Sequence, residues 1–263
     1  MMRHASVLAA YFAQFVKSRL AYRMDFFLDS LGVIAALAVQ LTFLGVLYTK
    51  IRSLAGWSFD ELLLIHGFSL VPLGLFNLIS PNLWGFSERH LVEGRFDRVL
   101  LRPVDPLFQV LFESFNVAAL NEIILGIVLM VVAGARMGIE PVPMDFVAFP
   151  VLAVSAAAVY LGVFVILTSV SFWFEDRLGI GPPVYNMIRF ARYPVTIYHP
   201  AVRLLLSWVV PFGFAAFYPA TRFLRAEEFY GFAALTPVMG AVCLGAAIWM
   251  FRLGMSRYSS TGS

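Results

Sequence analysis

Ionisable side chains stand inside two long apolar stretches of this sequence. Glu122 lies near the middle of one stretch, and Arg189 and Arg192 lie three residues apart in the other. A charge at the centre of a membrane helix costs roughly 2.5–3.5 kcal/mol on insertion scales, so such residues are functional candidates. Because residues three apart share a helical face, we predict that Glu122 pairs with Arg189 or Arg192 across packed helices. In the alternative, the arginines reach the membrane surface while Glu122 faces a wet cavity or a subunit contact.

A serine and two histidines are candidates for nucleophilic chemistry. Ser69 follows His66 in the stretch HGFSL, and His199 lies in a distant polar segment. The stretch lacks the second glycine of an intramembrane protease motif, and His199 is predicted at the far membrane boundary. We therefore favour a helix with small packing residues and expect no catalytic residue.

Cofactor and metal chemistry have no recognisable sequence support. His, Cys and carboxylate residues do not show the spacing of metal ligands, and Cys243 is the one cysteine of the chain. The sequence contains no G-x-x-x-x-G-K-[ST] phosphate loop. We expect no cofactor-binding and no metal-binding residue, and if the protein uses ATP, we expect another subunit to bind it.

The composition is that of a membrane protein. Of 263 residues, 60% are hydrophobic and 13% are charged, whereas a soluble domain carries about 25% charged residues. The apolar runs are continuous rather than alternating, which favours helices over a barrel. The net charge of +3 with no basic run predicts no nucleic-acid partner. We predict transmembrane helices at 26–48, 62–84, 107–134, 148–173, 178–197 and 231–251.

Two further segments are expected to touch the membrane without crossing it. Residues 3–25 have apolar side chains near helical spacing and predict an interfacial helix, the alternative being a plain lead-in to the first span. Residues 201–219 are apolar but contain Pro211, which favours a re-entrant segment over a seventh crossing. The distribution of lysine and arginine then places both termini in the cytoplasm, with 252–263 as a cytoplasmic tail. Arg203, Arg222 and Arg225 run against this bias.

A polar loop, residues 85–106, interrupts the apolar stretches. It is too charged for hydrocarbon and too rich in Leu, Val and Phe for a flexible linker. We predict one or two short amphipathic helices broken at Gly94 and stopped by Pro103 and Pro106. Such an element lies on the membrane surface with one face left for a partner protein. The titratable residues of this loop are Glu88, Arg89, His90, Glu93, Arg95, Asp97, Arg98, Arg102 and Asp105.

Motifs in and beyond the polar loop resemble those of ABC-2 type permeases, the membrane subunits of ATP-driven exporters. The polar loop is similar to the G-x-F-D-x-x-L-L-R-P-V-x-P-L signature of one subgroup. Looser matches are F-A-R-Y-P at 190–194, V-x-P-F-x-F-x-x-x-Y-P-A at 209–220 and the polar turn 174–177. The residues that match the signature are Gly94, Phe96, Asp97, Leu100, Leu101, Arg102, Pro103, Val104, Pro106 and Leu107.

The resemblance implies an all-α membrane protein, one domain over 1–263, located in the cytoplasmic membrane. It implies six transmembrane helices, an interfacial amino-terminal helix, a cytoplasmic coupling helix and re-entrant helices before the sixth span. The partners would be two ABC ATPase subunits and a second permease copy or a similar permease. An intramembrane enzyme and an ion-coupled carrier are the alternative functions. The residues expected to couple to the ATPase are Glu93, Gly94, Phe96, Asp97, Val99, Leu100 and Arg102, with Arg98 at the rim.

Overall fold

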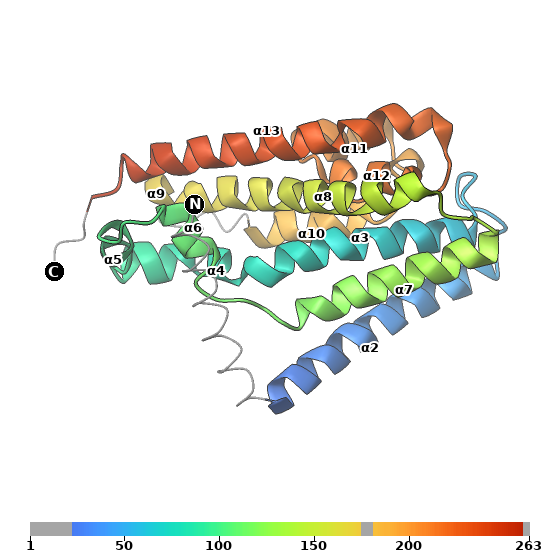
Figure 1. Ribbon diagram of the computed structural model, residues 1–263, viewed down its shortest axis with the longest axis horizontal. Coiled ribbons are helices and arrows are strands. Elements are labelled where there is room, and N and C mark those ends of the chain that lie inside the picture. The colour runs from blue at the N-terminus through green and yellow to red at the C-terminus, as the bar shows by residue number, and fades with distance from the viewer. Residues whose placement is uncertain (1–22, 175–180, 260–263) are drawn as a thin grey trace.

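The computed structural model describes residues 23–174 and 181–259, and no β-strand occurs in these two ranges (Figure 1). The long helices are α2 (Arg23–Tyr48), α3 (Phe59–Ile79), α7 (Ala119–Met137), α8 (Pro143–Ser169) and α13 (Tyr230–Met255). Five helical stretches of the described chain are long and apolar enough to cross a membrane, and each belongs mainly to one of these helices. The predicted all-α membrane class is confirmed.

The long helices pack side by side around α8. Helix α8 contacts α13 on one side and α3 on the other, α3 packs along α7, and α2 lies outermost (Figure 1). Glycines bring the paired helices close together. A Cβ added to Gly162 of α8 would lie 2.6 Å from Cys243 of α13, and one on Gly126 of α7 would lie 2.6 Å from the carbonyl of Gly67 of α3. Such close approach is the usual means of tight helix packing in lipid.

The third span predicted at 107–134 is wrong in its first third. The structure has a short helix α6 (Pro106–Leu111), then irregular chain, and α7 begins only at Ala119. Asn82 explains the break, because its Nδ2 donates to the carbonyls of Leu111 and Ser114, both at 3.0 Å. Because Asn82 satisfies these carbonyls, they do not require the backbone N–H groups of a continuous helix. The second span also ends early, at Ile79, where Pro81 starts the separate turn α4 (Pro81–Trp84).

Two parts of the predicted organisation are described only partly. The segment predicted as the fifth span contains α10 (Gly181–Ala191) and the turn η2 (Val195–Ile197), and residues 178–180 lie outside the described chain. Eleven residues of helix extend about 16 Å, roughly half of the hydrocarbon thickness. The interfacial helix at 3–25 also lies outside the described chain, except where Arg23 begins α2. The count of six crossings therefore stays a prediction.

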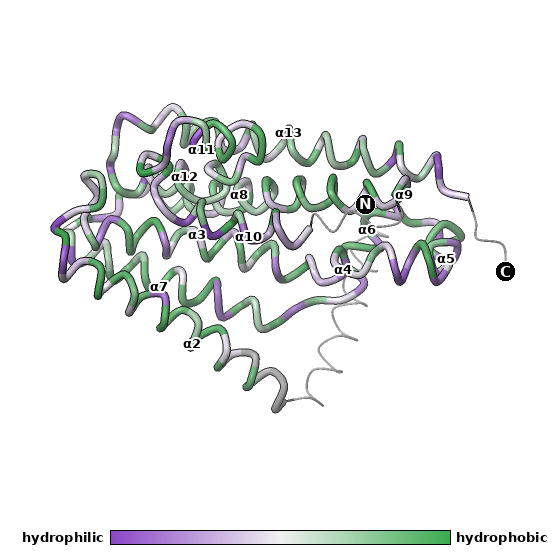
Figure 2. The backbone as a smooth tube through the Cα atoms, turned by 180° about the vertical axis from the view of Figure 1, so that it is seen from behind, coloured by the Kyte–Doolittle hydropathy of each residue, from purple (hydrophilic) through white to green (hydrophobic). Residues whose placement is uncertain are grey.

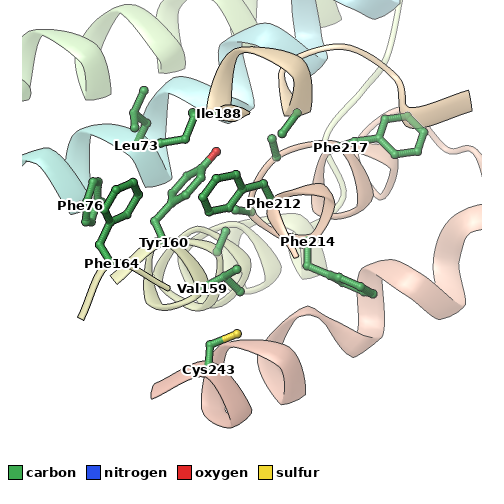
Figure 3. Close-up of a cluster of buried hydrophobic side chains, with 14 of the residues drawn as sticks. Leu73, Phe76, Val159, Tyr160, Phe164, Ile188, Phe212, Phe214, Phe217 and Cys243 are labelled. Carbon is green, nitrogen blue, oxygen red and sulfur yellow. The ribbon is translucent and has the colours of Figure 1, made fainter. Parts of the chain in front are cut away.

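Residues 201–219 form a series of short helices rather than one. They are α11 (Pro200–Leu204), η3 (Leu205–Val209), η4 (Phe212–Ala215) and α12 (Phe217–Thr221). The rings of Phe212, Phe214 and Phe217 are fully buried, and Figure 3 shows Phe212 beside Tyr160 of α8. This broken segment is covered by protein, as irregular backbone at membrane depth must be.

An ion-pair cluster ties the chain after this broken segment to the start of α8. Asp145 accepts from Arg225 at 2.6 Å and lies 3.3 Å from Arg222. Two of the three arginines that oppose the predicted charge bias thus have a structural role. They hold the connection between α12 and α13 against α8.

The polar chain gathers at the two ends of the bundle. Figure 2 shows hydrophobic residues along the long helices and hydrophilic ones mainly at the ends. One end carries α4, α5 (Phe96–Leu100), α6, α9 (Ser171–Phe174) and the end of α13, while α11 and α12 lie toward the other (Figure 1). The polar loop and the last described residues therefore share one end of the molecule.

Candidate functional site

The polar loop folds into two short helical elements with a sharp bend between them. A π-helical turn η1 (Ser87–Val92) precedes Gly94, and α5 follows it. Gly94 has a φ of 67°, which side chains other than glycine rarely adopt. The predicted break at Gly94 is confirmed, and it directs the two elements around one compact corner.

Phe96 attaches this corner to the rest of the protein. Its ring is fully buried and lies 5.5 Å from Phe172 of α9 and 6.3 Å from Phe251 of α13, measured between ring centroids. Phe86 and Tyr258 complete the cluster at 5.8 and 5.1 Å. The prediction that Phe96 contacts a partner is therefore wrong, because its ring has no surface left for one. Its role is to join the loop to α9 and α13.

A buried amide fixes the loop from its other side. Gln109 of α6 donates through Nε2 to the carbonyls of Val99 at 3.1 Å and Val104 at 2.8 Å. The Val99 carbonyl lies in the last turn of α5 and the Val104 carbonyl lies beyond its end. Carbonyls at the end of a helix have no backbone N–H partner within the helix. Val99 is half-buried against the core, and its predicted role as a partner contact stays a prediction.

Three large apolar side chains of the polar loop are exposed. Leu101 is 84% exposed, Val92 60% and Leu100 45%. We name these three side chains the apolar triad. Leu100 was predicted as a contact and is confirmed as exposed, whereas Val92 and Leu101 were not chosen. Leu101 could have been found, because it stands next to Leu100 in the signature.

Exposed charged groups belong to the same loop as the apolar triad. Glu93 forms an ion pair with Arg95 at 2.7 Å, and Arg98 and Arg102 are exposed. Asp97 is half-buried, and burial together with the nearby Asp97 carboxylate raises the pKa of Tyr258. An apolar centre with a charged rim is the composition of a protein-binding patch.

His90 and Glu113 connect η1 to the chain before α7. His90 is buried under Phe86, and its Nε2 lies 3.2 Å from Oε2 of Glu113. This hydrogen bond, aided by the charges of His90, Arg89 and Arg95, lowers the pKa of Glu113 against the opposing effect of burial. The carboxylate form is thus the one that the folded loop prefers.

The pair makes a pH-dependent contribution to stability with a definite sign. Because the pKa of Glu113 is lower in the folded chain, its contribution is present above its unfolded pKa of about 4.5 and is lost as the pH falls through the folded value. We expect the difference in melting temperature between wild type and Glu113→Gln to be constant above about pH 4.5 and to vanish below it. Thermal unfolding of the purified chain over this pH range measures it. A difference that grows on acidification would contradict this account.

The polar residues inside the bundle do not form the predicted ion pair. None of the ion pairs among the described residues joins Glu122 to Arg189 or Arg192. Glu122 instead accepts from Nδ2 of Asn77 at 2.8 Å, and Nη1 of Arg192 donates to Gln40 at 3.2 Å. Neutral amides on α2 and α3 lower the burial cost, and the sequence signal for them was a lone amide within each apolar run.

The two arginines differ in their surroundings. Arg189 is exposed, whereas Arg192 lies just past the end of α10 and lines a cavity with Glu122. The expectation that Arg189 and Arg192 share one helical face is wrong, because α10 ends at Ala191.

The residues considered for catalysis do not meet. Oγ of Ser69 donates to the carbonyl of His66 at 2.7 Å rather than to an imidazole, and Ser69 is fully buried. His199 is exposed, and its Nδ1 accepts from the backbone of Ala201 at the start of α11. Among the residues that the structure describes, no group of three or more His, Cys, Asp or Glu is placed to hold a metal ion.

Comparison with known proteins gives one match that covers most of the chain. A family model described as an ABC-2 family transporter protein matches residues 34–262. Neither the curated proteins nor the solved structures contain a match. The matched range includes the polar loop, the cavity and the broken segment before α13.

Proposed function

The chain belongs to the ABC-2 family of transporter proteins, and we propose from this that it is the permease of an exporter whose ATP is hydrolysed by separate subunits. The family makes it a multi-pass membrane component of an ABC transporter. The sequence has no phosphate loop of its own, which supports the separate ATPase. The direction of transport is part of the proposal.

The observation that supports a docked ATPase is the exposed apolar triad on a loop that is otherwise firmly anchored. Val92, Leu100 and Leu101 would enter a groove of the ATPase, and Arg98 and Arg102 would meet acidic groups at its rim. A mobile loop could not transmit a displacement, but this one packs on α9 and α13 through Phe96. Movement of the triad would therefore move the ends of membrane helices.

The energy for that movement comes from the ATPase. Two ATPase subunits that close on ATP would bind one arrangement of two permeases more tightly than another, and this difference in affinity shifts the permease between states. The second permease would be another copy of this chain or a similar one. Phe96 and Gly94 then serve coupling indirectly, as a joint and a bend, while the triad makes the contact.

This mechanism requires the polar loop on the cytoplasmic side. The loop and residues 252–259 lie at the same end of the bundle, which agrees with a cytoplasmic carboxyl terminus (Figure 1). The arginines of the loop agree with the positive-inside rule. A re-entrant path for 201–219, as its broken helices suggest, keeps the two termini on one side.

Co-purification tests the function. Expressed together with the genes that neighbour its own, the chain should retain an ATPase through purification, and ATP hydrolysis should respond to the presence of the permease. An ion-coupled carrier or an intramembrane enzyme would purify alone. Recovery of the isolated chain with full transport driven by a proton gradient would contradict the proposal.

A further inference from the structure

A cavity of about 410 Å³ opens between α2, α3, α7 and the end of α10. Its wall is apolar along most of its length, with Leu28 and Leu37 from α2, Leu70 from α3 and Leu125 from α7. Its polar members are Gln40, Glu122 and Arg192. An apolar wall with a few convergent polar groups is the composition of a small-molecule site.

Arg192 brings a positive charge into this cavity, and no carboxylate that the structure describes lies within ion-pair distance of it. Its Nη1 donates to the neutral amide of Gln40 at 3.2 Å, and its Nε is buried without a hydrogen-bond partner. None of the ion pairs within 23–174 and 181–259 includes Arg192. A guanidinium has five N–H donors and no way to lose its charge in a protein.

Glu122 does not provide the missing counter-charge. It is not within ion-pair distance of Arg192, and its Oε2 is already occupied by Asn77. A carboxyl group can also escape the cost of a low-dielectric site by binding a proton, whereas a guanidinium cannot. Of the two titratable groups in this cavity, Arg192 is therefore the one whose charge is permanent.

Two further buried polar atoms lack a partner among the described residues. Nε2 of His66 and Oη of Tyr160 are fully buried and have no hydrogen-bond partner. Figure 3 shows the Tyr160 hydroxyl directed toward Ile188 of α10. Buried polar groups are rarely left unpaired in proteins, so the unpartnered Nε of Arg192 at this cavity indicates a site with a polar occupant.

We propose that this cavity binds the anionic head group of an amphipathic molecule, with Arg192 as the anion partner and the apolar face of α2 against its hydrocarbon part. The head group would be a carboxylate or a phosphate. This inference rests on the proposed transport function, for which it names the class of substrate. The ligand enters from the bilayer, because a molecule of this chemistry partitions there.

Binding of a fluorescent fatty acid tests the site in the absence of an ATPase. The full chain is placed in phosphatidylcholine nanodiscs, and energy transfer from its tryptophans to cis-parinaric acid is compared with transfer to the methyl ester of that acid. We expect the acid to bind about tenfold or more tightly than the ester, as a hydrogen bond to a charged group would give. Arg192→Gln should abolish this preference.

The matched control is Arg189→Gln, which removes the same charge from an exposed position three residues earlier. The Arg189 variant should keep the preference for the acid. Arg192→Lys retains the charge and should keep part of the preference; it serves as the test if Arg192→Gln fails to fold. Equal binding of acid and ester to wild type, or an equal loss in both glutamine variants, would overturn the site.

Two further measurements distinguish the source of the ligand, and they distinguish failure of the substrate class from failure of the proposed function. If phosphatidylglycerol displaces the acid, the ligand is a bilayer lipid; if it does not, the site prefers a free amphipathic acid, and both results support an anion site. Loss of acid binding with the ATPase still attached would refute the substrate class alone. Loss of the ATPase with acid binding intact would refute the proposed function alone.

Discussion

Leu101→Asp is expected to detach the ATPase while leaving the permease folded. The side chain is 84% exposed, so an aspartate there meets water in the isolated chain and should change its unfolding free energy little. In a docked complex the same carboxylate would be buried among apolar groups of the partner without a counter-ion. Loss of a central contact residue costs about 2 kcal/mol or more, which is roughly a thirtyfold loss of affinity.

The control for this substitution is Ser259→Asp. It adds the same charge at another exposed position of the same end of the molecule. Its complex should hydrolyse ATP and co-purify as wild type does, while Leu101→Asp, alone or with Leu100→Asp, should not. Equal recovery of the ATPase with both variants would show that the triad is not the contact.

Phe96→Ala is expected to have the largest effect on stability in the polar loop. The substitution removes a fully buried ring that lies within 6.3 Å of four other rings. Truncation of a buried Phe costs about 3–5 kcal/mol, because the surrounding side chains collapse only partly into the space. The loop should then loosen from α9 and α13, and ATP hydrolysis should lose its coupling to transport.

Leu101→Ala is the matched variant, since it truncates an apolar side chain five residues away that is exposed. In denaturant unfolding, the free energy of unfolding of the two variants should differ by most of the cost expected for truncation of Phe96. Hydrogen exchange should become faster in η1 and α5 of the Phe96 variant and remain unchanged in the other. Similar stability of both would mean that Phe96 does not anchor the loop.

The extent of the polar loop, its division at Gly94 and the membrane class follow from sequence alone. Composition limits the class, and the φ of Gly94 explains the position of the bend. The direction of each side chain in α5 could not be predicted, because five residues make too little of a periodic pattern to assign an inner and an outer face. Phe96 was therefore placed outside when the rings of Phe172 and Phe251, far along the chain, hold it inside.

Tertiary contacts explain the other differences. The break before α7 depends on Asn82, about thirty residues earlier, which binds the carbonyls that a continuous helix would use. The partners of Glu122 and Arg192 are amides on α3 and α2 whose positions depend on helix packing. Charge complementarity suggested an ion pair, whereas the structure places the two charges in one cavity with separate neutral partners.

Photocrosslinking from the apolar triad tests the docking surface most directly. p-Benzoylphenylalanine in place of Leu101 should, on illumination of membranes that contain both subunits, yield a covalent product of this chain with the ATPase. The same probe at Trp249, an exposed position on α13 within a membrane-spanning stretch, should not. An intact complex that forms no such product from position 101, or forms it equally from position 249, would contradict the docking of the ATPase on the polar loop.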